Sequence, residues 1–336
     1  MTSPTVTVLD VGHGSCTVIT DGEHATLIDT GPGAPVLEYL LQEHIEVIDV
    51  VVLSHADEDH IRGLIALLGA DQFTIHRIML NSDAAKASES WRNLAYEIDE
   101  LHRSGSITLE VQLREGDIID TRIPEVDLHV LAPRDRLIIS GPGSKDRDGR
   151  RITSNSISAV ILICYRGVRL ALVTGDLDDV GLSHAIEASA DLSAQVLVFP
   201  HHGGLAGGSA AAAAGFAQQL VAKVDPESIA ISLGRGKYAN PRPEIIAGMR
   251  AGAPNARIAC TQLSRFCAVN LPLDRPGHLL PLFARGSANN ACCAGTMRIV
   301  PAQGNKVLPS DDALDFCTLS RAGWGRSRGG WDVIVT

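Results

Sequence analysis

The sequence predicts an α/β protein in which short buried strands alternate with helices. Short apolar segments recur along most of the chain and are separated by glycine, proline and aspartate, the residues that break strands and helices. Three of these segments end in histidine and aspartate, residue types that can bind metal ions. Because side chains at strand ends can meet at one edge of stacked sheets, we expect these residues to converge. They are His55–His60, Asp176 and His201–His202.

The N-terminal half supports this prediction element by element. Strands rich in β-branched residues are expected first, with Asp21-Gly22 as a hairpin turn between two of them. Helices with an apolar face are expected after each later break in the chain. The predicted strands are 5–11, 16–20, 25–28 and 50–53, and the predicted helices are 36–42, 61–68 and 86–104.

The second half continues in the same style without repeating the sequence. Two strands flank an Arg166-Gly167 turn, and further strands alternate with helices, one of them alanine-rich. The predicted strands are 157–165, 168–173, 196–199 and 229–232. The predicted helices are one that follows Gly175-Asp176 and ends at about residue 190, and two over 209–222 and 241–251.

Residues 54–60 carry the strongest chemical signal. They read Ser-His-Ala-Asp-Glu-Asp-His and follow a buried apolar strand. Burying such side chains without partners costs roughly several kcal/mol each, whereas divalent cations satisfy them. The alternative is a solvated acidic loop. Because Asp176 and two adjacent histidines also follow strands, we favour a metal centre.

Composition sets limits on partners and location. The chain has 336 residues, of which 45% are apolar and 20% charged, values typical of a globular core. A formal charge of -10 disfavours broad attraction to nucleic acid. No apolar stretch is long enough to span a membrane, and the N-terminus does not resemble a signal peptide. We therefore expect a cytoplasmic protein with reduced cysteines and no membrane partner.

Positive charge gathers locally in the loop 144–151. Arg150 and Arg151 directly precede the Ser154-Asn155-Ser156 segment. Guanidinium groups there could hold the phosphate oxygens of a substrate. The alternative is a solvated loop of alternating charge.

Several motifs together resemble the metallo-β-lactamase superfamily. They are Leu27–Gly31, Ser54–His60, Thr174–Asp176 and His201–Gly203. Within that superfamily the chain looks most like the subgroup of the cytoplasmic domain of the DNA-uptake protein ComEC and its stand-alone relatives. The matching residues are Leu9–Gly14, Ser154–Ser156 and the glycines after His202. The resemblance implies a four-layer αβ/βα fold and hydrolysis by a hydroxide that two metal ions activate.

The same resemblance implies roles for individual residues. His55 and Asp57 would hold one metal, and Asp176 would bridge to the second. Asp59, His60 and either His201 or His202 would complete the second position, with Asp59 and His202 taking part in catalysis. Three residues would lie behind the ligands and support them, namely Asp29, His13 and Asn155.

The chain departs from the family pattern at four places. Asp57 stands where a second histidine is usual, and Asn155 is nearest to a missing isolated histidine. His13 replaces a glutamine of the subgroup, and Asn240-Pro241 replaces a His-Pro pair. Oxygen ligands favour harder ions. We therefore expect manganese ahead of zinc.

The chain beyond residue 258 is predicted to be an extension of the hydrolase domain 1–258. Its cysteines suggest a structural zinc site, in which His278 could replace one ligand; buried thiols and a redox role are the alternatives. The extension 259–336 could pack on the main domain or bind a protein partner or nucleic acid. The cysteines are Cys260, Cys267, Cys292 and Cys293.

Three functions are consistent with these patterns. The leading hypothesis is a phosphodiesterase or nuclease acting on nucleic acid or a nucleotide, because two metals suit the charge that develops on phosphorus. The second is a carboxylic ester or lactone hydrolase. The third is a protein-binding subunit that holds metal but has weakened catalysis, as the departures at Asp57 and Asn155 would allow.

Overall fold

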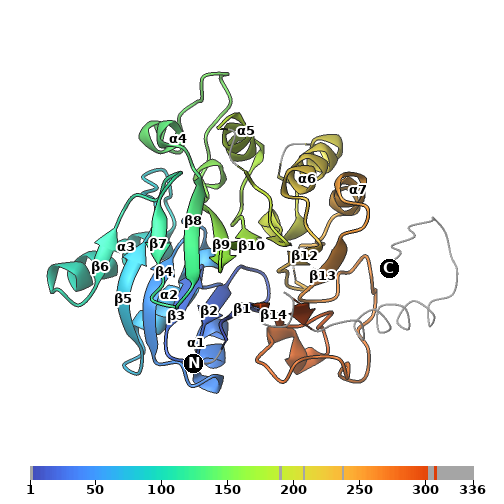
Figure 1. Cartoon of the computed structure of the whole chain (residues 1–336), viewed down its shortest axis with the longest axis horizontal. Helices are drawn as coiled ribbons and strands as arrows, with labels where there is room; N and C mark the ends of the chain where they lie inside the picture. Colours follow the sequence, from blue (N-terminus) through green and yellow to red (C-terminus); the bar gives the residue numbers. More distant parts are fainter. Residues whose placement is uncertain (1–2, 189–190, 207–208, 237, 302–305, 309–336) are drawn as a thin grey trace, which may run out of the picture.

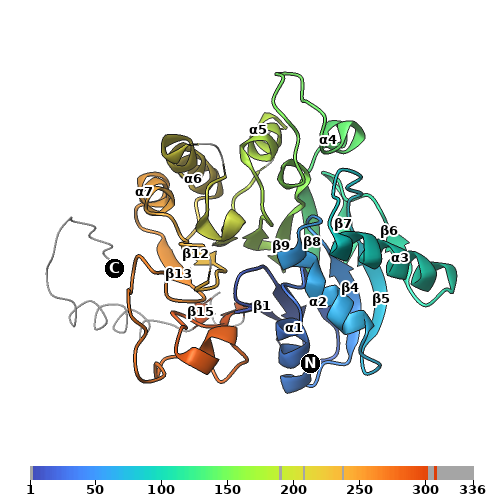
Figure 2. The same ribbon diagram turned by 180° about the vertical axis from the view of Figure 1, so that it is seen from behind.

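The computed structural model stacks two β-sheets face to face and covers their outer faces with helices (Figures 1 and 2). The structure describes residues 3–301 apart from 189–190, 207–208 and 237, and also residues 306–308. In the part of the chain it describes, no helix is both long and apolar enough to cross a membrane.

The first sheet contains most of the N-terminal half and one contribution from the other end of the chain. Its strand order is β15-β14-β1-β2-β3-β4-β5-β6, and β3 to β6 are parallel. The strands are β1 (Thr5–Val8), β2 (Thr17–Thr20), β3 (Ala25–Ile28), β4 (Val47–Val52), β5 (Thr74–Met79), β6 (Thr108–Glu110), β14 (Met297–Val300) and β15 (Lys306–Leu308).

The second sheet has the order β13-β12-β11-β10-β9-β8-β7, in which β10 to β13 are parallel. The carboxyl ends of β10 and β11 therefore lie side by side. The strands are β7 (Ile118–Asp120), β8 (Val126–Ala132), β9 (Val160–Tyr165), β10 (Val168–Val173), β11 (Val196–Val198), β12 (Ser228–Ile231) and β13 (Arg257–Cys260).

Three apolar layers hold the sheets and helices together. One lies between the sheets, one between the first sheet and helices α1 to α3, and one between the second sheet and α5 to α7. Alternation along β4 shows the arrangement: Val50 and Val52 face the layer between the sheets, and Val51 faces the helices. The helices are α1 (Pro35–Gln42), α2 (Glu58–Leu68), α3 (Glu89–Arg103), α4 (Asp135–Ser140), α5 (Asp179–Glu187), α6 (Ala210–Val224) and α7 (Pro243–Gly252).

This is the four-layer αβ/βα arrangement that the resemblance implied. The predicted strands 25–28 and 168–173 coincide with β3 and β10. The strand predicted from residue 157 begins at Val160, because Asn155–Ile157 forms the short helix η1. The sequence patterns did not identify β5 to β8, α4 or β13 to β15.

The C-terminal segment joins the first sheet. β14 pairs antiparallel with β1 through Val6 and Ile299, and Ile299 is fully buried. The division predicted at residue 258 falls inside β13. Residues 309–336 of the predicted extension lie outside the described residues.

Candidate metal centre

Three strand ends from two sheets deliver the polar side chains. The loop 54–60 follows β4, Asp176 follows β10, and the two histidines follow β11. Contacts between loops fix these ends together: the Ala159 N–H donates to the Ser54 carbonyl oxygen at 2.9 Å. Gly175 has a φ of +51°, and a Cβ there would lie 2.6 Å from the Ser54 Oγ. Glycine thus permits the close approach that brings Asp176 to the first sheet.

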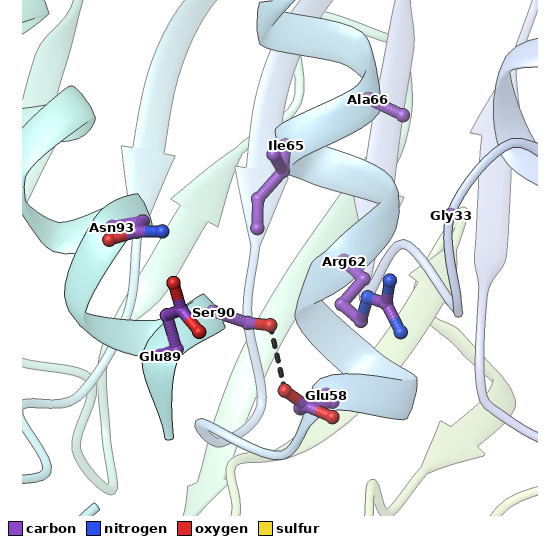
Figure 3. Close-up of a pocket in the computed structure, with 8 residues that line it drawn as sticks. All are labelled: Gly33, Glu58, Arg62, Ile65, Ala66, Glu89, Ser90 and Asn93. Atoms are coloured by element: carbon purple, nitrogen blue, oxygen red, sulfur yellow. Dashed lines mark hydrogen bonds between the residues drawn. The ribbon is translucent and has the colours of Figure 1, made fainter. Parts of the chain in front are cut away.

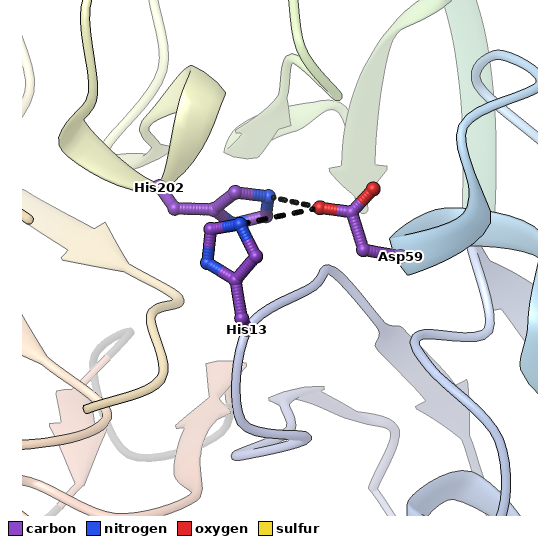
Figure 4. A group of neighbouring side chains, drawn as sticks. All are labelled: His13, Asp59 and His202. Carbon is purple, nitrogen blue, oxygen red and sulfur yellow. Dashed lines mark hydrogen bonds and ion pairs between the residues drawn. The ribbon is translucent and has the colours of Figure 1, made fainter. Parts of the chain in front are cut away.

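Histidine and aspartate side chains form two groups of potential metal ligands. One group is His13, Asp59 and His202, and the other is His55, His60 and Asp176, with the ligand atoms of each group within 4.8 Å of one another. Figure 4 shows the first group converging from three separate segments. The Asp59 Oδ2 lies 3.1 Å from the His202 Nε2 and 3.6 Å from the His13 Nε2.

Asp176 connects the two groups. Its Oδ1 lies 3.3 Å from the His60 Nε2 and 3.7 Å from the His202 Nε2. Its Oδ2 lies 3.9 Å from the His55 Nε2 and 3.5 Å from the His201 Nδ1. Each oxygen of one carboxylate therefore faces a different pair of imidazoles.

Buried hydrogen bonds orient the imidazoles. The His60 Nδ1 donates to the Asp29 Oδ2 at 2.8 Å. The Ser54 Oγ donates to the same oxygen at 2.8 Å and lies 2.9 Å from the His55 Nδ1, so it accepts the proton of that nitrogen. On the other side, the His202 Nδ1 donates to the Ser232 carbonyl oxygen at 2.9 Å. Each Nε2 is thereby directed into the centre, the arrangement expected of metal ligands.

Unsatisfied atoms indicate what the centre would accommodate. The Nε2 atoms of His55 and His60 are buried and have no hydrogen-bond partner among the described residues. A buried polar atom without a partner is costly. A divalent cation would satisfy both nitrogens together with the neighbouring carboxylates, so these residues fit the ions that the fold family implies.

The doubled histidines use an unusual backbone conformation. His201 and His202 have φ values of 53° and 54°, in the left-handed region that few non-glycine residues adopt. From an extended chain, neighbouring side chains would point to opposite faces. Here both imidazoles approach Asp176, but only His202 belongs to a ligand group. The His201 backbone N–H also donates to the Asp176 Oδ1 at 3.1 Å.

The electrostatics of the centre favour bound positive charge. Burial alone would raise the pKa of Asp176, but the charges of His60, His201 and His202 outweigh it and hold this pKa well below its usual value. Burial alone would lower the pKa of His60, but Asp29 and Asp176 raise it well above its usual value. Protons and metal ions are thus attracted to the same carboxylates.

His13 lies closer to the centre than the sequence indicated. Its ring centroid is 4.5 Å from that of His202 and 4.7 Å from that of Tyr238. Burial, and then the charge of His202, lower the pKa of His13 to about 4, so the imidazole is neutral at pH 7. A neutral imidazole can bind a metal directly. The supporting role expected for His13 therefore becomes a potential ligand role.

The first metal position, predicted at His55 and Asp57, differs from the second because a lysine lies beside it. The Asp57 Oδ1 lies 3.8 Å from the His55 Nε2 and also accepts a hydrogen bond from the Lys86 ammonium. Lys86 was not identified from the sequence, because it lies between β5 and α3 rather than at a strand end. No spacing pattern would have singled it out.

In the basic loop 144–151, Arg150 already binds other residues of the protein. Arg150 binds Asp146 through Nε at 2.7 Å and the Ser183 Oγ on α5 through Nη1 at 3.0 Å. Its use as a phosphate contact would require these bonds to break. Arg151 is exposed, and its backbone bridges to Lys145. Asn155 begins η1, and its backbone N–H donates to the Thr153 Oγ1 at 3.2 Å.

The structural zinc site predicted at Cys260, Cys267, Cys292 and Cys293 stays a prediction, since neither ligand group found among the described residues contains a cysteine. The segment that carries these cysteines surrounds the buried Asp10. The Asp10 carboxylate accepts hydrogen bonds from the Gln262 Nε2 at 2.8 Å, the Gly286 N–H at 2.9 Å and the Cys292 Sγ at 3.5 Å.

A hollow of about 530 Å³ lies beside the metal loop, between α2 and α3 (Figure 3). Glu58 points into it and accepts a hydrogen bond from the Ser90 Oγ at 2.7 Å. We place the chemistry at the ligand groups, because none of the lining residues belongs to them. The hollow is lined by Gly33, Glu58, Arg62, Ile65, Ala66, Glu89, Ser90 and Asn93.

Comparisons with known proteins identify the family of this chain. The family model of the metallo-β-lactamase superfamily matches residues 9–201. ComE operon protein 3 of Bacillus subtilis (strain 168) is 24% identical over 211 residues, which cover 62% of this chain and 23% of that protein. The chain therefore spans less than a quarter of the length of this relative.

Two solved structures are similar at low identity. The metallo-β-lactamase fold protein YhfI of Bacillus subtilis has a TM-score of 0.48 and 14% identity, covering 76% of this chain and 96% of that one. The metallo hydrolase Igni18 of Ignicoccus hospitalis has a TM-score of 0.43 and 16% identity, covering 76% and 94%. Since the family model alone spans more than half of the sequence, the chain belongs to the metallo-β-lactamase superfamily and is a metal-dependent hydrolase of that fold.

Proposed function

We propose that the chain hydrolyses phosphodiesters, in nucleic acid or a nucleotide, with two divalent metal ions. The observation that carries the proposal is the position of Asp176. Its two oxygens face imidazoles on opposite sides, His60 and His202 on one and His55 and His201 on the other. A carboxylate in this position can be shared by two cations.

Bound ions would lower the pKa of water and stabilise charge on the phosphoryl oxygens. His202 and Asp59 would each have a role beside these ions. His202 would act through Nε2, since its Nδ1 proton is committed to Ser232. Asp59 would hold the second ion, and its pKa is lowered: burial opposes this, but the hydrogen bond from His202 and the charge of His60 outweigh it. Asp59 is thus an anion at neutral pH.

The proposed metal is manganese, with zinc as the alternative. Asp57, Asp59 and Asp176 supply oxygen donors beside imidazoles, a mixture that both ions accept. The preference for manganese depends on Asp57, which stands where the family usually has histidine. Reconstituting metal-free protein with each ion and measuring turnover distinguishes them.

The substrate class is supported by the similarity to ComE operon protein 3 and by the ComEC-like motifs at Leu9–Gly14 and His201–Gly204. Since this chain matches a minor part of that protein, DNA uptake is not proposed for it. The cytoplasm remains the expected location.

The direct test is hydrolysis of bis(p-nitrophenyl) phosphate and single-stranded DNA by manganese-loaded protein. The wild type should cleave at least one of them, and an Asp59→Ala/His60→Ala variant should not. Carboxylic esters and lactones are tested beside them. Faster cleavage of an ester or lactone would replace the proposal. Tight metal binding without any cleavage would favour the metal-holding subunit with weakened catalysis.

A further inference from the structure

Lys86 places a positive charge inside the first metal position. Its ammonium donates to the Asp57 Oδ1, the same oxygen that lies 3.8 Å from the His55 Nε2. The side chains of Lys86 and Asp57 are 23% and 31% exposed. Both therefore remain accessible to a substrate that enters from solvent.

The backbone around Lys86 is fixed by a buried carboxylate. The Asp83 Oδ1 accepts hydrogen bonds from the N–H groups of Ala85 and Lys86, each at 3.1 Å. Its Oδ2 accepts a hydrogen bond from the Ser154 Oγ, directly before η1, the short helix that precedes β9 of the second sheet. The Trp91 indole on α3 donates to the Asp83 carbonyl oxygen at 3.2 Å. Lys86 is thus held by contacts to two other parts of the fold.

The two metal positions consequently differ in charge. A cation at the first position would draw on His55, Asp57 and the Asp176 Oδ2, and it would share Asp57 with an ammonium. A cation at the second position would draw on Asp59, His60, His202 and the Asp176 Oδ1, with no lysine or arginine paired to Asp59 among the described contacts. Like charges at close range repel, and partial burial strengthens the repulsion.

We propose that Lys86 is a built-in cation of the first position. It weakens metal binding there, and it offers its remaining N–H donors to an anionic oxygen of the substrate, in the way that lysine binds phosphate. The substrate part rests on the proposed phosphodiester hydrolysis; the metal part does not.

The metal part is tested by calorimetric titration of metal-free protein with manganese, checked by elemental analysis. The wild type should bind one ion tightly and a second at least about tenfold more weakly. Lys86→Met should strengthen the weak step by about tenfold and leave the tight step unchanged, since removing a charged contact is worth about this much. Lys86→Arg should keep the weak step weak.

Lys223→Met is the matched control, because Lys223 is exposed on α6. It should leave both steps unchanged. Two equally tight steps in the wild type, or an unaltered weak step in Lys86→Met, would overturn the metal part. Circular dichroism checks that each variant is folded.

The substrate part is tested with inorganic phosphate as the probe, bound to protein saturated with manganese. Lys86→Met should weaken phosphate binding by about tenfold, and Lys86→Arg should restore much of it. Equal phosphate affinity in wild type and Lys86→Met would refute this part. A wild type that binds phosphate through Lys86 but cleaves no phosphodiester would instead contradict the proposed function.

Discussion

The two sides of the metal centre share one carboxylate but differ in almost everything else. On the histidine side, formed by His13, Asp59, His60 and His202, the His13 and His202 imidazoles approach the Asp59 Oδ2, and the His60 and His202 imidazoles approach the Asp176 Oδ1. On the lysine side, formed by His55, Asp57, Lys86 and His201, an ammonium already occupies Asp57. Asp176 lies between them.

The two metal positions of this one centre therefore differ in how their ligands are supported. The imidazoles on the histidine side are oriented by Asp29 and the Ser232 carbonyl oxygen. On the lysine side, the Ser54 Oγ orients the His55 imidazole, but the Asp57 carboxylate is already paired with the Lys86 ammonium. We therefore expect the histidine side to hold its ion more tightly, and the following experiments test that expectation.

The largest effect should come from Asp176→Asn, which removes the charge that both sides use. Mutating a residue that hydrogen-bonds to a metal ligand typically lowers metal affinity or activity 10–100-fold, and mutating a ligand shared by two metals should lower them further. We expect phosphodiester turnover to fall by more than about 100-fold and both manganese binding steps to weaken. Asp179→Asn, at an exposed position on α5, is the control and should behave like the wild type.

A paired comparison separates the sides. Asp59→Asn and Asp57→Asn make the same chemical change in the same loop. Asp59→Asn should weaken the tight manganese step by about 100-fold, whereas Asp57→Asn should change it by less than about tenfold. Titration calorimetry measures both. If Asp57→Asn proved the more damaging to the tight step, the assignment of the two sides would be reversed.

Asp29→Asn tests the support behind the ligands. Asp29 accepts hydrogen bonds from His60 and Ser54, and its side chain is fully buried. The amide cannot accept both with the same charge, so manganese affinity should fall by about 10–100-fold. Elemental analysis after dialysis against a fixed manganese concentration gives the result; full retention of metal would exclude this role.

The smallest expected effect is that of Ser54→Ala. The Ser54 Oγ relays between His55 and Asp29, and a single hydrogen bond contributes about 1 kcal/mol, or roughly fivefold in affinity. The weak manganese step should change by this factor and the tight step by less. An equal loss on both steps would show that Ser54 supports the whole centre rather than the lysine side.

The site could be predicted from the sequence where local patterns encode it. β4, β10 and β11 are apolar runs that end abruptly in ligand-type residues, and parallel strands bring such ends to one edge. That reasoning named His55, Asp59, His60, Asp176 and His202 as ligands, which the structure places in two groups of potential ligands, and it assigned His13 a supporting role. The left-handed backbone of His201 and His202 has no local sequence signal other than the glycines that follow.

Long-range contacts account for what the sequence did not reveal. Lys86 owes its position to a hydrogen bond between Asp83 and Ser154, 71 residues apart. The segment that carries the cysteines packs around Asp10, whose partners Gln262 and Gly286 lie more than 250 residues away in the sequence. Neither contact produces a period or a motif.

The attachment of Asp10 has a consequence for biosynthesis. The loop that carries His13 starts at Asp10, which is held by Gln262, Gly286 and the N–H contact to Thr296. A ribosome makes these partners after the loop 54–60 and the paired histidines. The His13 loop of a nascent chain could therefore be fixed only once Thr296 has been made, and hydrolytic competence should not appear before that point.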